Sequence, residues 1–128
     1  MDKVHFRNAY YIKLGRKGDW EKSSIQENKI RLGWSQQSIK DINSNRWDII
    51  LKKLRDQLPK SKVTKDFNAL KRIVTSSSAD IWITFHAAYL WWCHPGDSEI
   101  YEDETSKYRM VKGSWSNKNI EGELIIIN

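Results

Sequence analysis

The sequence predicts an α+β domain in which a small curved antiparallel or mixed sheet, or an open barrel, is flanked by helices. Segments with the apolar spacing of helices gather before residue 76, whereas alternating apolar segments dominate after residue 80. The chain has 128 residues, no internal repeat and no low-complexity linker, which suits a single domain with its own core. We therefore expect one domain over residues 1–128, and the apolar run at 123–127 is typical of a module from a longer protein.

The first four predicted elements alternate between strand and helix. Residues 9–15 are rich in β-branched and aromatic side chains and end in glycine, as a strand does. Asp19 is a candidate N-cap for a short helix over 19–28. Residues 29–34 alternate between apolar and polar positions and predict a second strand. Residues 35–42 suit a further helical turn or two, with the first serine as the cap.

Two amphipathic helices are predicted next, over 45–59 and 62–76. Asn45 and Asp48 resemble a capping box at the start of the first helix, and Pro59 is its expected end. Each helix carries apolar residues at helical spacing, which defines the face that we expect to join the core. These residues are Trp47, Ile50 or Leu51, Leu54, Leu58, Val63, Phe67, Leu70 and Val74.

The stretch "IWITFHAAYLWWCH" predicts a hairpin of two strands, 81–86 and 89–94. Apolar or aromatic residues occupy both faces of these strands, so both faces must be covered. The turn near Ala87 and Ala88 uses poor turn residues, and a helix over 84–92 is the alternative. The remaining segments are expected to be a loop or acidic edge at 95–105, a strand at 107–113, a turn at 114–122 and a last strand at 123–127.

Charge is distributed unevenly along the chain, whose formal net charge is +6. Residues 52–72 carry eight basic and two acidic side chains, whereas residues 73–128 are acidic overall. This asymmetry favours a surface that faces a polyanion, although a solvated helix face is the simpler alternative. The expected contacts to a nucleic-acid backbone are Lys52, Lys53, Arg55, Lys62, Lys65, Lys71 and Arg72, together with Arg16 and Lys17 in the turn "GRKG".

Composition and motifs argue against several other classes of protein. The sequence has no membrane-length apolar run and no signal peptide, and its one cysteine forms no internal disulfide, so we expect a cytoplasmic protein with no membrane partner. Cys93, His94 and His86 lack the spacing of a metal site. The acidic residues at 99–104 lie in a polar segment and suit a solvated edge better than a two-metal site. We therefore expect no catalytic set, no metal and no cofactor.

The seven tryptophans exceed what the core of so small a domain needs. Trp47 falls on the core face of a predicted helix, but Trp20 and Trp34 lie at the ends of elements beside basic or polar segments. Such tryptophans form slots in which a flat base stacks, at about 1–3 kcal/mol per base. The sequence thus favours at least one exposed aromatic pocket.

Residues 10–38 resemble the start of the YTH and EVE domains of the PUA-like superfamily. The matching pairs are Ile12-Lys13, Ser24-Ile25 and Trp34-Ser35. The resemblance implies a PUA-like fold and a reader that holds one base in an aromatic cage. It makes Trp34 a cage wall beside Ser35 and Lys13 a contact to the backbone or the pocket rim. Trp20, Trp82 and Trp92 compete for the second wall.

The expected function is that of a nucleic-acid-binding module that recognises a flipped-out, modified base. EVE-type modules occur in modification-dependent restriction proteins, so the resemblance favours DNA over RNA. The alternatives are an RNA reader and an interaction module with an aromatic groove for a peptide or small ligand. A third alternative is an enzyme that works through Cys93 and His86.

Overall fold

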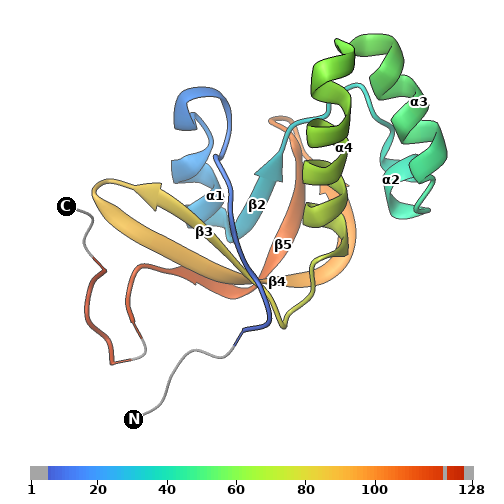
Figure 1. Cartoon of the computed structure of the whole chain (residues 1–128). Helices are drawn as coiled ribbons and strands as arrows, with labels where there is room; N and C mark the ends of the chain where they lie inside the picture. Colours follow the sequence, from blue (N-terminus) through green and yellow to red (C-terminus); the bar gives the residue numbers. More distant parts are fainter. Residues whose placement is uncertain (1–5, 120, 126–128) are drawn as a thin grey trace.

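The computed structural model describes residues 6–119 and 121–125 and confirms the α+β class (Figure 1). Five strands form one mixed sheet in the order β1-β3-β4-β5-β2. β1 pairs with β3 in parallel, and the other neighbouring pairs are antiparallel. The elements are β1 (Ala9–Tyr11), the single turn η1 (Arg16–Gly18), α1 (Glu21–Glu27), β2 (Lys29–Leu32), α2 (Ile39–Asn43), α3 (Trp47–Gln57), α4 (Lys60–Thr75), β3 (Ile81–His86), β4 (Tyr89–Glu102) and β5 (Lys107–Ser116).

The sheet is open, yet its two edge strands lead to the same cavity. β1 and β2 stand at opposite ends of the strand order. Even so, Ile12 and Lys13, which follow β1, line a cavity together with Leu32 and Gly33 at the end of β2. The sheet must therefore curve, and the long strand β4 contains two register shifts, which bend a strand. The predicted curved sheet is therefore present, and its edges approach each other without pairing.

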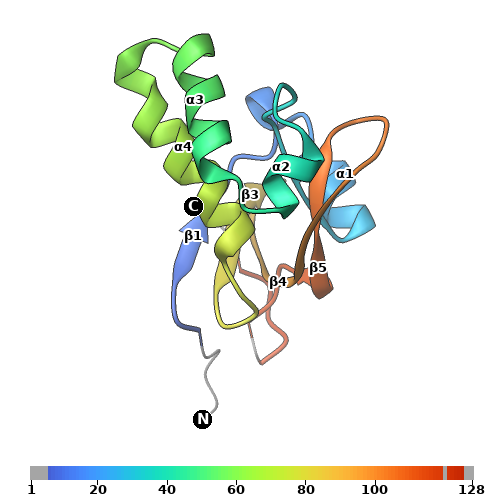
Figure 2. The ribbon, with the colours of Figure 1, turned by 90° about the vertical axis from the view of Figure 1, so that its right-hand side faces the viewer.

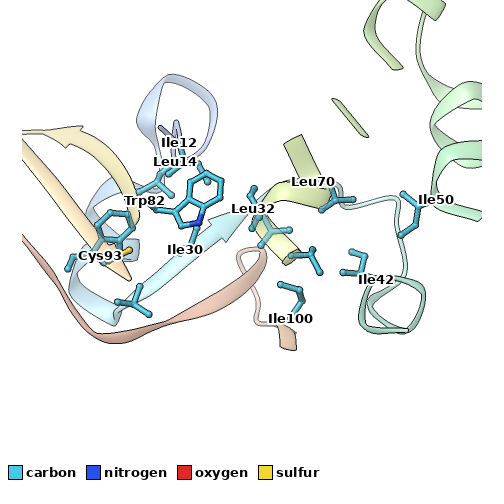
Figure 3. Close-up of a cluster of buried hydrophobic side chains, with 14 of the residues drawn as sticks. Ile12, Leu14, Ile30, Leu32, Ile42, Ile50, Leu70, Trp82, Cys93 and Ile100 are labelled. Atoms are coloured by element: carbon cyan, nitrogen blue, oxygen red, sulfur yellow. The ribbon is translucent and has the colours of Figure 1, made fainter. Parts of the chain in front are cut away.

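The hydrophobic core continues from the curved sheet to the helices. Figure 3 shows Trp82 and Cys93 beside Ile30 at one end, and Leu70, Ile50 and Ile42 at the other. All of the predicted core positions on α3 and α4 are buried or pack against this cluster. The two helices form a hairpin at one end of the molecule, seen from two sides in Figures 1 and 2.

Arg109 anchors α4 to the sheet. Its guanidinium, on β5, donates to the carbonyls of Ile73 and Val74 at the end of α4 and to Ser76 Oγ, at 2.8–3.4 Å. It also donates to the carbonyls of Gly96 and Asp97 in β4, at 3.0 and 2.9 Å. The side chain is buried, and this burial lowers the pKa of Arg109. One cation thus satisfies the last carbonyls of a helix and fixes that helix over β4.

Several predicted element ends and caps are wrong. Trp20 rather than Asp19 precedes α1, and Ser38 rather than the earlier serine caps α2, accepting a hydrogen bond from Asp41 N at 3.0 Å. The capping box before α3 does not form, because Arg46 is the N-cap residue and makes no side-chain cap bond. Pro59 lies between two helices, because α3 ends at Gln57 and Pro59 is the N-cap residue of α4. Its position agrees with the extended backbone that a proline imposes on the preceding residue, Leu58.

The hairpin is confirmed, and the alternative helix over 84–92 is wrong. Ala87 and Ala88 adopt φ of 52° and 70°, so the turn has the left-handed backbone that asparagine and glycine normally supply. β4 continues through most of the predicted loop at 95–105. Pro95 fits because it lies where the register shifts, and Ile100 is buried, so the segment is a strand despite its acidic residues.

The predicted last strand at 123–127 is present only as a bridge where the structure describes it. Leu124 pairs with Lys118 in an isolated antiparallel bridge, and residues 126 and 127 lie outside the described part of the chain. Among the described helices, none has the length and apolar character to cross a bilayer.

Candidate functional site

A cavity of about 850 Å³ lies between the two sheet edges and the α3–α4 hairpin. We call it the Trp34 cavity. Trp20, Trp34, Ser35 and Trp82 line it, so the structure brings together four of the five residues predicted from sequence for an aromatic pocket. Its volume falls within the range typical of small-molecule sites.

Trp34 is held in an unusual backbone conformation. Its φ is 57°, in the left-handed region that a bulky side chain seldom adopts. Its indole Nε1 donates to Asp66 Oδ2 on α4 at 2.7 Å, which fixes the ring against the helix. Strained residues of this kind concentrate at ligand sites, where surrounding contacts hold them in place.

Trp20 forms a second half-buried wall, and its position depends on Gly15. Gly15 has φ of 81°, and a Cβ added there would lie 3.0 Å from the Trp20 ring. The backbone N–H of Trp20 donates to the carbonyl of Leu14 at 3.0 Å and closes the turn that carries the ring. A larger residue at position 15 would crowd the Trp20 ring and strain the turn that carries it.

Trp82 is the floor of the cavity rather than an open wall. It is 3% exposed, and its Nε1 donates to Ser76 Oγ at 2.9 Å. Its cross-strand partner is Cys93, so both side chains lie on the inner face of the curved sheet. The sequence-based placement of Trp82 as an exposed cage wall is therefore corrected.

Trp92 does not line the Trp34 cavity. It follows Trp91 and precedes Cys93, whose side chain faces inward with Trp82, so strand alternation directs Trp92 to the opposite face of the sheet. There its Nε1 donates to the carbonyl of Lys118 at 2.8 Å, and its ring meets His94 edge-on. Its sequence-based assignment to the pocket is corrected for this reason.

Five basic side chains line the Trp34 cavity. Arg31 is buried and pairs with Asp103. The basic rim consists of the other four, which are Lys13, Arg16, Lys65 and Arg72. Within residues 6–119 and 121–125, the ion pairs of the structure involve other cations, and these four have none. The carboxylate among the lining residues is that of Asp66, which the Trp34 indole already occupies. The rim thus carries a net positive charge, because its four cations without ion pairs outnumber the one lining carboxylate.

The other predicted backbone contacts divide into two groups. Lys17 is exposed next to Arg16, and Lys62 lies one helical turn before Lys65 and Asp66 on α4, so both adjoin the rim. The remaining cations serve other faces of the hairpin. Lys53 pairs with Asp41 at 3.2 Å. Lys71 lies over the rings of Trp47 and Phe67. Lys52 and Arg55 are exposed at positions of α3 that are rotated away from the residues that line the cavity.

Sequence reasoning missed Asp66 and Gln37. Asp66 carried no signal beyond its helical position, because its link to Trp34 spans 32 residues. Gln37 lies in the polar segment "SQQS", which gave no hint of burial, yet it is 2% exposed and lines the cavity. Neither its Oε1 nor its Nε2 has a hydrogen-bond partner among the described residues.

Cys93 and His86 do not form a nucleophilic pair. Cys93 is 1% exposed, and burial raises the pKa of its thiol far above the usual range. His86 lies four residues beyond Trp82, the cross-strand partner of Cys93, which corresponds to about 13 Å along a strand. Its Nδ1 instead lies 2.9 Å from Glu21 Oε1. Among the described residues, no cluster of three or more His, Cys, Asp or Glu side chains could hold a metal ion.

Comparisons of the chain with protein-family models, with curated proteins and with solved structures return no match.

Proposed function

We propose that this chain is a nucleic-acid-binding module that holds one unpaired base in the Trp34 cavity. One observation carries the proposal. Two half-buried tryptophans, Trp20 and Trp34, line a single cavity whose basic rim has no carboxylate partner in the part of the chain that the structure describes. A flat aromatic ligand with attached negative charge matches this combination better than a neutral ligand does.

The tryptophans would supply the stacking energy. Base–aromatic stacking contributes about 1–3 kcal/mol per base, and this gain must offset the few kcal/mol needed to unpair a base from a duplex. The strained, hydrogen-bonded Trp34 would offer its ring already oriented, so less conformational freedom is lost on binding. A single-stranded or already flipped base is therefore the preferred ligand.

The basic rim would bind the phosphates on either side of that base. Lys13 and Arg16 come from the segment that follows β1, with Arg16 in η1, and Lys65 and Arg72 come from α4, so two separate segments supply the cations. Four phosphate contacts to a single strand predict a salt slope near −3, or a roughly 50-fold loss of affinity over a fourfold rise in salt.

The resemblance to EVE and YTH domains supports the same proposal at a finer level. It favours a PUA-like reader of a modified base, with DNA preferred over RNA, in a restriction setting. The position of Trp34 and Ser35 at the cavity is the observation that agrees with this resemblance.

Fluorescence anisotropy titrations at two salt concentrations test the proposal. The probes are matched DNA and RNA oligonucleotides, each with plain, methylated or hydroxymethylated bases. We expect binding that weakens steeply with salt and differs between modified and plain strands. Tighter binding to RNA would transfer the proposal to an RNA reader, whereas no binding at low salt would overturn it and favour a peptide or small-ligand groove.

A further inference from the structure

We infer that the side-chain amide of Gln37 reads the hydrogen-bonding edge of the base in the Trp34 cavity, so that the ligand must present its pairing edge unblocked. This inference rests on the proposed function and adds the chemical feature that the cavity selects. It starts from a side chain that lines the cavity, is 2% exposed and has neither of its two polar atoms paired within the described residues. Because both amide atoms are themselves buried, the side chain must turn into the cavity to meet the base.

Such an amide is unusual in a folded protein. Buried polar side chains are nearly always hydrogen-bonded, because an unpaired donor or acceptor loses its contacts with water and gains nothing in return. Besides the two atoms of Gln37, Ser24 Oγ is the remaining buried side-chain atom without a partner in the described part of the chain. Two of the three orphaned atoms therefore belong to one residue at the cavity.

The backbone joins Gln37 to the main aromatic wall. The N–H of Gln37 donates to the carbonyl of Trp34 at 3.0 Å, which closes a four-residue turn over 34–37. The Lys107 Nζ donates to the carbonyl of Ser35 within this turn and helps to hold it on the sheet. The strained tryptophan and the unpaired amide are thus the two ends of one turn at the cavity.

The chemistry of the amide defines what it would recognise. A glutamine presents one N–H donor beside one carbonyl acceptor, and nucleobases present the complementary pair on their pairing edges. Thymine offers N3–H beside a carbonyl oxygen, and adenine offers its amino group beside a ring nitrogen. A base still paired in a duplex uses this edge and cannot offer it to Gln37.

The test uses a short DNA oligomer of abasic spacers with one central nucleotide, so that the phosphates stay constant and one base is varied. The central nucleotides are thymidine and N3-methylthymidine, and adenosine and N6,N6-dimethyladenosine, as their deoxy forms. In each pair, the methylated base keeps the stacking surface of the plain base but has its pairing edge blocked. Affinities are measured by anisotropy for the wild-type chain, for Gln37→Met and for Gln26→Met, an exposed glutamine on α1 away from the cavity.

For the base that the wild-type chain binds more tightly, we expect the blocked form to bind roughly tenfold more weakly or worse. In Gln37→Met this difference should vanish, while Gln26→Met keeps it. Gln37→Met should also melt at a higher temperature than the wild-type chain, because it removes a buried amide without partners.

Three results are distinguishable. If the wild-type chain distinguishes blocked from unblocked bases and Gln37→Met distinguishes them equally well, Gln37 is not the reader and the inference is wrong, although the cavity still binds a base. If the wild-type chain binds both forms equally but binds the abasic oligomer more weakly, the cavity reads stacking alone and the inference is again wrong. If no base improves binding over the abasic oligomer, the proposed function itself fails.

Discussion

Cations in this molecule occur in two regions with opposite environments. On β2, Arg31 is buried at the edge of the Trp34 cavity and contacts both oxygens of Asp103 at 2.8 Å, and Lys29 adds a further bond to Asp103 at 2.9 Å. Hydrogen bonding to Asp103 raises the pKa of Arg31, and the same contacts lower that of Asp103. At the basic rim of the Trp34 cavity, by contrast, Lys13, Arg16, Lys65 and Arg72 have no carboxylate partner within the described ranges.

The tryptophans divide in the same way. Trp82, Trp92 and Trp115 donate their indole N–H groups to Ser76 Oγ and to backbone carbonyls, so the chain itself uses them. Trp34 also donates its indole N–H, to Asp66, but its half-buried ring lines the cavity, as does the half-buried ring of Trp20. The comparison teaches that residue type alone separates neither set; what separates them is whether a half-buried ring lines the cavity.

The largest expected effect comes from breaking the partnered region at Arg109. Arg109→Met leaves the carbonyls at the end of α4 and in β4 without their donor, which we expect to cost about 3 kcal/mol of unfolding free energy. Urea denaturation measures this loss. The affinity of the folded variant for an oligonucleotide should stay within twofold of wild type. A loss of oligonucleotide binding without a loss of stability would contradict the distinction between structural cations and cations at the cavity.

Asp103 should contribute to the pH dependence of stability. Its pKa is depressed in the folded state, so its contribution is present above the unfolded value of about 4 and is lost as pH falls through the folded value. Asp103→Asn should cost about 2 kcal/mol at pH 7 because buried Arg31 keeps only the more exposed Glu27 as a charged partner. Thermal unfolding at several pH values should show that the difference in stability between the wild-type chain and Asp103→Asn becomes smaller on acidification. A difference that stays constant with pH would argue against the ion pair.

Breaking the cavity instead should affect binding more than folding. Trp34→Ala removes the stacking wall and should weaken binding of an oligonucleotide by about 1–3 kcal/mol, or roughly 5- to 150-fold. Trp92→Ala is the matched control, because this tryptophan lies on the other face of the sheet. Anisotropy titrations compare the two variants, and an equal loss in both would show that the cavity is not the binding site.

The basic rim should determine the salt dependence. Lys65→Gln and Arg72→Gln should each reduce the magnitude of the salt slope by about 0.7, the value for one contact to a single-stranded phosphate. Lys52→Gln, on a part of α3 rotated away from the cavity, controls for net charge. If all three variants change the slope equally, the rim has no special role beyond its charge.

The smallest effect concerns the hairpin turn. Ala88 adopts φ of 70°, which costs a residue with a Cβ about 1 kcal/mol relative to glycine. Ala88→Gly should therefore raise the unfolding free energy by up to about 1 kcal/mol, measured in urea. Ala79→Gly, at an exposed position without positive φ, should be neutral or slightly destabilising, and the opposite ranking would contradict this account of the turn.

Much of the fold was predictable because it follows local rules. Apolar spacing predicted α3 and α4, and alternation predicted the β3–β4 hairpin even though its turn residues are unfavourable. The caps before α1 and α3 were not predictable in this way. The strand at 95–102 was predicted as a loop because its residues are mostly polar or charged. Its strand conformation depends on contacts with neighbouring strands, which bury Ile100 and accommodate a register shift at Pro95.

The candidate site was predictable only for residues whose position at the end of an element, or whose side of a strand, can be inferred from the sequence. Trp20, Trp34 and Ser35 all line the cavity, as expected. The alternation of side chains along a strand could have excluded Trp92 once Trp82 was assigned to the inner face of the sheet. The Trp34–Asp66 bond and the burial of Gln37 arise from contacts between distant segments, which no local pattern records.

The most direct test of the central claim compares two oligomers of equal length, one wholly abasic and one with a single central base. Anisotropy titrations are made with the wild-type chain and with Trp34→Ala. If the Trp34 cavity holds one base, the single base should raise the affinity of the wild-type chain at least fivefold and leave that of Trp34→Ala nearly unchanged. Equal affinity of the wild-type chain for both oligomers would contradict base binding and leave the basic rim as a site for phosphate alone.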